Sequence, residues 1–251
     1  MSSLDTSADA YDERAHVYEE FGNGVLADVV LDALPEGGSI LDVGCASGGL
    51  LNLVGQRAGR RVGIEVSASA ATAARAFADE VLVADLSDLA ALGEPFPEER
   101  FDLVVCADVL EHLTDPVSAL ARVGSWCKAD GQIVVSVPNV AYWKVRLALA
   151  RGRWRYEDSG ILDKGHLRFF TAETIGDLVR DAGLDPGGVV PVVPHLGHHL
   201  RLDGLPTRIS RRLARAWMTL GHRQPGLFGF QLICVARPRP GPAGAAPPHV
   251  R

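Results

Sequence analysis

The sequence predicts an α/β protein with a doubly wound sheet whose strands are mostly parallel. Its five expected central strands are short continuous apolar runs, the pattern of strands buried on both faces of a parallel sheet. Helical stretches and short connections alternate with these runs, and that rhythm favours right-handed crossovers that place helices on both faces. The strands are expected at residues 39–43, 61–66, 81–85, 101–106 and 132–137.

Helices are expected between and around these strands, and capping residues mark several of their ends. Asp115 is placed as an N-cap before Pro116, which fits the first helical position. Ser67 or Ser69 is suited to cap an alanine-rich helix, and Thr171 to cap a later one. The helices are expected at residues 11–34, 50–58, 67–79, 115–128, 171–182 and 207–220.

After Pro138 the regular alternation of strands and helices ends. Beyond it we expect two inserts that cover a substrate (139–170 and 195–226), two further strands (189–193 and 228–236) and a disordered tail rich in proline, glycine and alanine (237–251). A proline inside the first of these strands favours an irregular or edge position. We expect residues 1–236 to form a single domain.

Charge is distributed unevenly along the 251 residues, although the net charge is only −6. Residues 1–140 carry a net −15, residues 141–223 a net +6 and residues 224–251 a net +3. The acidic part is a poor platform for nucleic acid, so no nucleic-acid partner is expected. The basic part is suited to an anionic acceptor or to peripheral contact with a membrane surface.

Cysteine usage and apolar run lengths indicate a cytoplasmic protein. No run approaches 18 apolar residues and no signal-peptide pattern is visible, so no membrane span or leader is expected. The four cysteines (45, 106, 127 and 234) are far apart, which favours free thiols in a reducing compartment, with Cys127 in a helix. No metal site is expected: zinc-type cysteine spacing is absent, and the histidines at 195, 198 and 199 have few acidic neighbours.

The strongest functional signal is the turn after the first strand, Asp42-Val-Gly44-Cys-Ala46-Ser-Gly48-Gly. Glycines let the backbone turn sharply and approach a ligand without a Cβ in the way. A dinucleotide fingerprint needs G-x-G-x-x-G, and Ala46 stands where its second glycine belongs. A nucleotide-cofactor dehydrogenase is therefore the weaker alternative.

Two acidic residues lie at the ends of the next two strands. Glu65 ends the second strand 21 residues after Gly44, where a carboxylate can accept hydrogen bonds from both ribose hydroxyls. Asp85 ends the third strand, where it can accept from an adenine amine while the backbone N–H of Leu86 meets the ring. Any one of these acids could be a helix cap or a solvated strand end. Acids at successive strand ends together are harder to explain without a ligand.

Together these segments make the chain resemble the class I S-adenosylmethionine-dependent methyltransferases. The resemblance rests on residues 42–48, 63–65, 83–85, 101–105 and 108–113, and Ala46 departs from the family's usual glycine. It implies S-adenosylmethionine as cofactor, with Asp42, Gly44 and Gly48 around its amino-acid part and Asp108 near its methionyl portion. It also implies a Rossmann-like sheet of seven strands, mostly parallel with the last strand antiparallel.

The second half of the chain resembles bacterial methyltransferases of polysaccharide and natural-product pathways. It more distantly resembles the ubiquinone-pathway O-methyltransferases. Both resemblances rest on residues 137–140 and 160–171. This implies a small acceptor, glycan-like or anionic, or a secondary metabolite, methylated on oxygen. An acceptor hydroxyl gains from a base with a pKa near neutral, and histidine is the usual choice. His166, in the loop 160–171, is the preferred candidate and His112 is the alternative.

Two other hypotheses stay open. The aromatic and basic segment 142–156 is either a lid with solvated arginines or a clamp that stacks on an acceptor ring. The chain could also be a non-catalytic adapter that keeps the fold and uses its basic half as an interaction surface.

Overall fold

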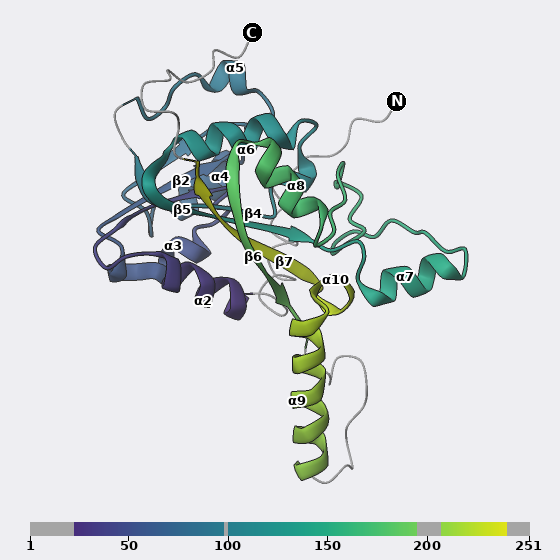
Figure 1. The fold of residues 1–251 in the computed structure, drawn as a ribbon. Coiled ribbons are helices and arrows are strands. Elements are labelled where there is room, and N and C mark those ends of the chain that lie inside the picture. Colours follow the sequence, from purple (N-terminus) through teal and green to yellow (C-terminus); the bar gives the residue numbers. More distant parts are fainter. Residues whose placement is uncertain (1–22, 98–99, 195–206, 240–251) are drawn as a thin grey trace.

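The computed structural model describes residues 23–97, 100–194 and 207–239, and these contain a seven-stranded sheet with the strand order β3-β2-β1-β4-β5-β7-β6 (Figure 1). Strand β7 runs antiparallel to both of its neighbours, and the other pairings are parallel. The doubly wound sheet with an antiparallel last strand is confirmed. The strands are β1 (Ser39–Val43), β2 (Arg60–Glu65), β3 (Glu80–Val83), β4 (Phe101–Ala107), β5 (Cys127–Pro138), β6 (Leu184–Val192) and β7 (Gln231–Pro238).

Helices pack on both faces of this sheet because successive strand residues point to opposite sides. Leu41 and Val43 of β1 lie in one buried core, whereas Ile40 lies in the other. The first core takes in α6 (Pro116–Ser125) and α8 (Thr174–Asp181), and the second takes in α2 (Asn23–Ala33), α3 (Gly49–Val54) and α4 (Ala68–Ala74). The remaining helices are α5 (Leu89–Leu92), α7 (Trp143–Ala150), α9 (Thr207–Arg223) and α10 (Pro225–Phe228).

Capping residues act largely as expected. The Asp115 carboxylate accepts from Ser118 N at 3.1 Å, and the Ser67 hydroxyl accepts from Ala70 N at 3.3 Å. The Thr171 hydroxyl accepts from Thr174 N at 3.2 Å, so it caps the first turn of α8. The expected helix 50–58 is shorter, because α3 gives way to a 3₁₀ turn at Gly55–Arg57.

The predicted boundary between the helix at 115–128 and the fifth strand is wrong by several residues. Helix α6 ends at Ser125 rather than Lys128, and Cys127 begins β5 instead of lying in a helix. The reason is Trp126, which is fully buried edge-on against Phe96, with ring centroids 5.5 Å apart, while its carbonyl accepts from Phe101 N at 2.8 Å. Burial of this ring draws the chain into the sheet early.

The last two strands also differ from expectation. Strand β6 begins at Leu184, five residues early, with an irregularity before Val189. Strand β7 begins at Gln231, because Phe228 belongs to α10, and it continues through Pro238, past the expected start of the tail. Residues 1–22, 195–206 and 240–251, which include the histidines at 195, 198 and 199, lie outside the described residues.

Helix α9 extends away from the sheet (Figure 1) and exposes both arginines and apolar side chains, among them Ile209 and Leu213. Contact of this segment with a membrane surface stays a prediction. Within the described ranges, no helix combines the length and the apolar character that crossing a bilayer requires. The four cysteines are buried and unpaired, as expected.

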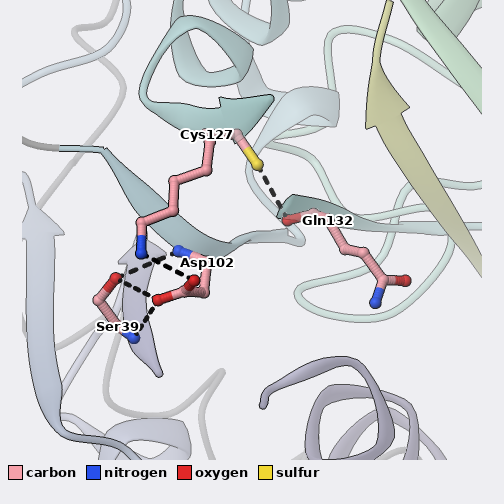
Figure 2. Close-up of polar contacts among 5 residues, drawn as sticks. Ser39, Asp102, Cys127 and Gln132 are labelled. Atoms are coloured by element: carbon pink, nitrogen blue, oxygen red, sulfur yellow. Dashed lines mark hydrogen bonds and ion pairs between the residues drawn. The ribbon is translucent and has the colours of Figure 1, made fainter. Parts of the chain in front are cut away.

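A polar network ties β1, β4 and β5 together at the amino ends of β1 and β4 (Figure 2). One carboxylate oxygen of Asp102 accepts from Ser39 N at 2.8 Å and from Ser39 Oγ at 2.9 Å, and the other accepts from Lys128 Nζ at 2.8 Å. Burial alone would raise the pKa of Asp102, but these donors outweigh it and lower the pKa below its usual value. The network lies at the edge of the sheet opposite the glycine turn, so it serves stability.

We therefore expect Asp102→Ala to lower the free energy of unfolding by about 1–3 kcal/mol, because it leaves part-buried donors without an acceptor. Urea denaturation measures this loss, and cofactor affinity should not change. Asp130→Ala, an exposed acid on the same strand as Lys128, is the matched control and should stay within about 0.5 kcal/mol of wild type. Equal stabilities of the two variants would contradict a structural role for the network.

Candidate active site

The turn after β1 folds back on β2 and leaves no room for a side chain at Gly44 or Gly48. The backbone N–H groups of Gly44 and Cys45 both donate to the carbonyl of Ile64, at 2.8 and 3.0 Å. Gly44 and Gly48 adopt left-handed φ values of 76° and 87°. A Cβ on Gly44 would lie 2.4 Å from Val109 Cγ2, so the turn packs directly against the segment after β4.

Ala46 occupies the position where the resembled family has its middle glycine, and it adopts a left-handed φ of 45°. Such a conformation is uncommon for a residue with a Cβ and is retained where the surroundings fix it. The Glu65 carboxylate helps to fix this conformation, because its Oε2 accepts from Ala46 N at 2.9 Å. An exposed alanine is thus accommodated without unfolding the turn.

Glu65 joins the ends of β1 and β2 through its side chain. Its Oε2 accepts from Ala46 N, its Oε1 accepts from Ser67 N at 2.8 Å, and the residue is only 5% exposed. A carboxylate has about four acceptor sites, so two stay free for hydroxyl donors of a ligand. The geometry therefore allows Glu65 both to hold the turn and to accept from a ribose.

We expect Glu65→Ala to weaken binding of S-adenosylhomocysteine by about 1.5–3 kcal/mol, the usual cost of removing hydrogen bonds to a charged acceptor. Isothermal calorimetry measures the affinity, and circular dichroism checks the fold. Glu80→Ala, an exposed acid at the start of β3, is the control and should bind like wild type. Unchanged affinity in a folded Glu65 variant would remove this residue from the site.

Asp42 lies buried in β1 just before the turn. Burial and the negative charge of Glu65 raise the pKa of Asp42 to about 7. Its folded-state pKa thus exceeds its unfolded value, so the folded protein binds more protons than the unfolded chain between about pH 4 and 7. Stability falls as pH rises through that window.

We expect wild type to lose about 2–3 kcal/mol more stability than Asp42→Asn between pH 5 and pH 7.5, because a neutral amide cannot ionise. Urea denaturation of the ligand-free protein at the two pH values measures the difference. Asp28→Asn, at an exposed position of α2, is the control and should behave like wild type. The same pH dependence in all three proteins would contradict the raised pKa of Asp42.

Asp85 and Leu86 come after β3 and have different environments. The Asp85 carboxylate is exposed, and its Oδ1 accepts from Ser87 N at 2.8 Å. Leu86 is buried in the core on the α6 and α8 face. Strand β3 neighbours β2 in register, Val83 opposite Glu65, so Asp85 lies at the same edge of the sheet as Glu65.

Asp108, directly after β4, is held from across the sheet. It adopts a left-handed φ of 56°, and both of its carboxylate oxygens accept from Gln231 Nε2, at 2.7 and 2.6 Å. Gln231 begins β7 and is buried. Sequence reasoning missed Gln231. Its signal was a single amide side chain at the start of an otherwise apolar strand.

A second group of side chains lies one turn further along the chain. Glu111 and His112 belong to a 3₁₀ turn at Leu110–His112, and the loop that carries His166 docks on it, because Leu167 N and Arg168 N both donate to the Glu111 carbonyl, at 2.7 and 3.0 Å. The rings of His112 and His166 lie edge to face with centroids 4.9 Å apart. Glu111, His112 and His166 each place one ligand-type atom within 4.8 Å of the others.

Aromatic side chains extend from this cluster toward solvent. The Phe169 ring lies 6.4 Å from the His166 ring and 5.5 Å from the Trp154 ring, centroid to centroid. Trp154 and Tyr156 are 39% and 53% exposed. Phe169 thus lies between the His166 ring and the exposed Trp154 ring, and contact of this segment with an acceptor stays a prediction.

The structure brings the two groups together through strand order. Strands are added to one side of β1 as far as β3 and to its other side from β4 onward, so the strand order switches between β1 and β4. In such sheets ligands bind at the carboxyl ends of the strands at that point. The glycine turn comes after β1, and the segment with Asp108, Glu111 and His112 comes after β4. Val109, which packs on Gly44, lies between them.

Comparisons with known proteins agree with this arrangement. Residues 18–186 match the family model described as "Methyltransferase domain". The "Ubiquinone biosynthesis O-methyltransferase" of Cereibacter sphaeroides is 32% identical over 155 residues, 60% of this chain and 62% of that protein. The protein of the same name from Alkalilimnicola ehrlichii is 36% identical over 110 residues, 41% of this chain and 43% of that protein. The match thus spans less than two thirds of these curated relatives.

Solved methyltransferase structures share the fold over nearly the whole chain. A S-adenosylmethionine-dependent methyltransferase of Thermotoga maritima gives a TM-score of 0.59 at 17% identity and covers 92% of this chain and 96% of its own. One from Aquifex aeolicus gives 0.56 at 15% identity, with 91% and 96% covered.

The sheet, the turn and these matches identify the chain as a class I S-adenosylmethionine-dependent methyltransferase. The chain belongs to the methyltransferase domain family, which decides against the dehydrogenase alternative. Family and fold imply S-adenosylmethionine as the methyl donor. The residues present fit it: the absence of a Cβ lets Gly44 pack on Val109 and Gly48 pack on Ala74, so the turn is tight, and Glu65 at the end of β2 has free acceptor sites.

Proposed function

We propose that the protein transfers a methyl group from S-adenosylmethionine to an oxygen of a small acceptor molecule. The observation that carries this proposal is the cluster of Glu111, His112 and His166 on the segment after β4, within a few residues of the contact between Val109 and the glycine turn. Proton-handling groups beside a methyl-donor site are what a hydroxyl acceptor needs.

The chain's own residues have three tasks in this reaction. S-adenosylmethionine supplies a methyl group that is already activated by its positive sulfonium. Glu65 and the turn hold the cofactor, and Asp108, fixed by Gln231, limits where its methionyl end can lie. The His166 loop closes over Glu111, which positions the acceptor and excludes water.

The acceptor class we favour is a hydroxyl on an aromatic ring. The two curated relatives are named for ubiquinone biosynthesis, a route to a ring-bearing quinone. The exposed rings of Trp154 and Tyr156 offer a surface on which a planar acceptor can stack. A sugar hydroxyl, as the second half of the sequence led us to expect, is the other outcome that the assay must distinguish.

A methyl-transfer assay with S-adenosylmethionine tests this function. Purified protein is incubated with phenolic and catecholic acceptors in one panel and with sugars and nucleotide sugars in another, and products are detected by the added mass of one CH₂ group. Product from the phenolic panel, reduced in Glu65→Ala when S-adenosylmethionine is below saturation, is the expected result. Binding of S-adenosylhomocysteine without product from either panel or from cell extract would instead favour a non-catalytic adapter.

A further inference from the structure

Glu111 is a buried carboxylate whose environment is incomplete. The residue is 1% exposed, and neither of its carboxylate oxygens has a donor at hydrogen-bond geometry within the described part of the chain. The neighbouring polar group is the Asp108 carboxyl, which can share a hydrogen bond with Glu111 only while one of the two acids is protonated. Burial, together with the charge of Asp108, raises the pKa of Glu111 well above its usual value. Buried carboxylates without partners are costly, and one cause of retaining them is a cation that completes the site.

Both neighbouring imidazoles are oriented in the same way. His112 Nδ1 donates to the Gly165 carbonyl and His166 Nδ1 donates to the Ile161 carbonyl, each at 3.1 Å. A carbonyl can only accept, so Nδ1 carries a proton, and in the neutral imidazole Nε2 then keeps its lone pair. Histidines that bind metals are characteristically fixed by this outer hydrogen bond.

The two imidazoles and the Glu111 carboxylate lie close together. His166 Nε2 lies 4.0 Å from Glu111 Oε1, and the ligand-type atoms of all three residues lie within 4.8 Å of one another. Ligand atoms sit about 2.0–2.2 Å from a bound zinc ion. Each side chain would need to move inward by less than about 1 Å, which a rotamer adjustment supplies.

We propose that Glu111, His112 and His166 bind one divalent cation of the borderline class, such as Zn²⁺. Two imidazoles and one carboxylate favour this class over Mg²⁺ or Ca²⁺, which prefer oxygen ligands alone. The site replaces the metal-free expectation drawn from the sequence.

This inference deepens the proposed function and rests on it for the role of the ion. A cation with an open coordination position lowers the pKa of a hydroxyl that binds to it. The acceptor hydroxyl then gives its proton to water, its oxygen forms the new bond to the methyl carbon, and the electron pair of the broken carbon–sulfur bond neutralises the sulfonium. A phenolic acceptor with a neighbouring oxygen fits such an ion best, because both oxygens can reach it.

The test is metal binding by the full chain without a polyhistidine tag. Protein stripped with EDTA is titrated by calorimetry with ZnCl₂, MnCl₂ and MgCl₂ in separate runs, and metal content after dialysis is measured by mass spectrometry. We expect one equivalent of Zn²⁺ to bind, and Mn²⁺ and Mg²⁺ to bind much more weakly. Glu111→Gln and His166→Ala should each weaken that binding at least tenfold while they still bind S-adenosylhomocysteine.

Matched controls outside the cluster are Glu173→Gln and His222→Ala, both at exposed positions, which should bind metal like wild type. No binding by wild type, or equal binding by the cluster variants and the controls, would overturn the site. Metal binding that depends on the cluster, with no product from any hydroxyl acceptor, would instead contradict the proposed function and leave the metal site standing.

Discussion

Gly44→Val is expected to abolish binding of S-adenosylhomocysteine. Two independent effects act at this position. The left-handed φ of 76° is strained for any β-branched residue, and a Cβ would lie 2.4 Å from Val109 Cγ2. The turn would have to move away from the segment after β4, and the surface that faces the cofactor would be lost with it.

Calorimetry measures the affinity, and a folded state must first be shown by circular dichroism and thermal melting. Gly93→Val is the matched control, because Gly93 also has a left-handed φ, 61°, but a Cβ there meets nothing within 4 Å. It should lose stability and keep its affinity. Near-normal binding by a folded Gly44→Val protein would show that the cofactor does not lie at this turn.

A second variant distinguishes the steric contact with Val109 from the backbone strain at residue 44. In Gly44→Ala with Val109→Ala the clashing methyl group of Val109 is removed, so this double variant should bind better than Gly44→Ala alone. Equal affinities would mean that backbone strain, not the contact, limits binding.

Much of the fold can be predicted from local patterns in the sequence. The buried strand of residues 101–106 has no alternating polarity to confuse its assignment, and Asp115 with Pro116 marks a helix start by chemistry that acts within four residues. The errors occur where distant packing decides. Trp126 ends its helix because it fits against Phe96, a contact that no local pattern shows.

The same distinction holds for the site. The position of Glu65 could be predicted because parallel strands bring their carboxyl ends to one edge, whereas Asp108 was indicated by the family resemblance, and the role of each stays a prediction. Gln231, 123 residues from Asp108, could not be predicted. Glu111 was hidden for another reason. One acid beside a histidine looks like a solvated pair until the loop of His166 folds over it and buries it.

The loop that carries His166 is held in shape by hydrogen bonds to its own backbone N–H groups. The Asp163 carboxylate accepts from Gly165 N at 2.6 Å, and the Asp163 carbonyl accepts from His166 N at 3.1 Å. This tight turn accompanies a buried imidazole, which is 7% exposed, whereas the sequence predicts only that His166 lies in the loop 160–171.

His166→Ala is expected to lower the rate of methyl transfer by about 10²–10⁴, the usual share of assistance to proton loss at the reacting group. Cofactor affinity should barely change, because His166 lies on the acceptor side, beyond the turn and Glu65. Single-turnover measurements with saturating S-adenosylmethionine report the chemical step, and calorimetry with S-adenosylhomocysteine reports the affinity. His222→Ala, at an exposed position of α9, should match wild type in both.

His112→Ala decides how the two histidines share the task. If the cluster acts as a unit, both single variants slow the chemical step by similar factors, and the double variant is hardly slower than either. If His112→Ala alone reproduces the loss, the role passes from His166 to His112. If neither variant slows the step, the acceptor needs no help with a proton, and an amine or carboxylate acceptor would then replace the hydroxyl.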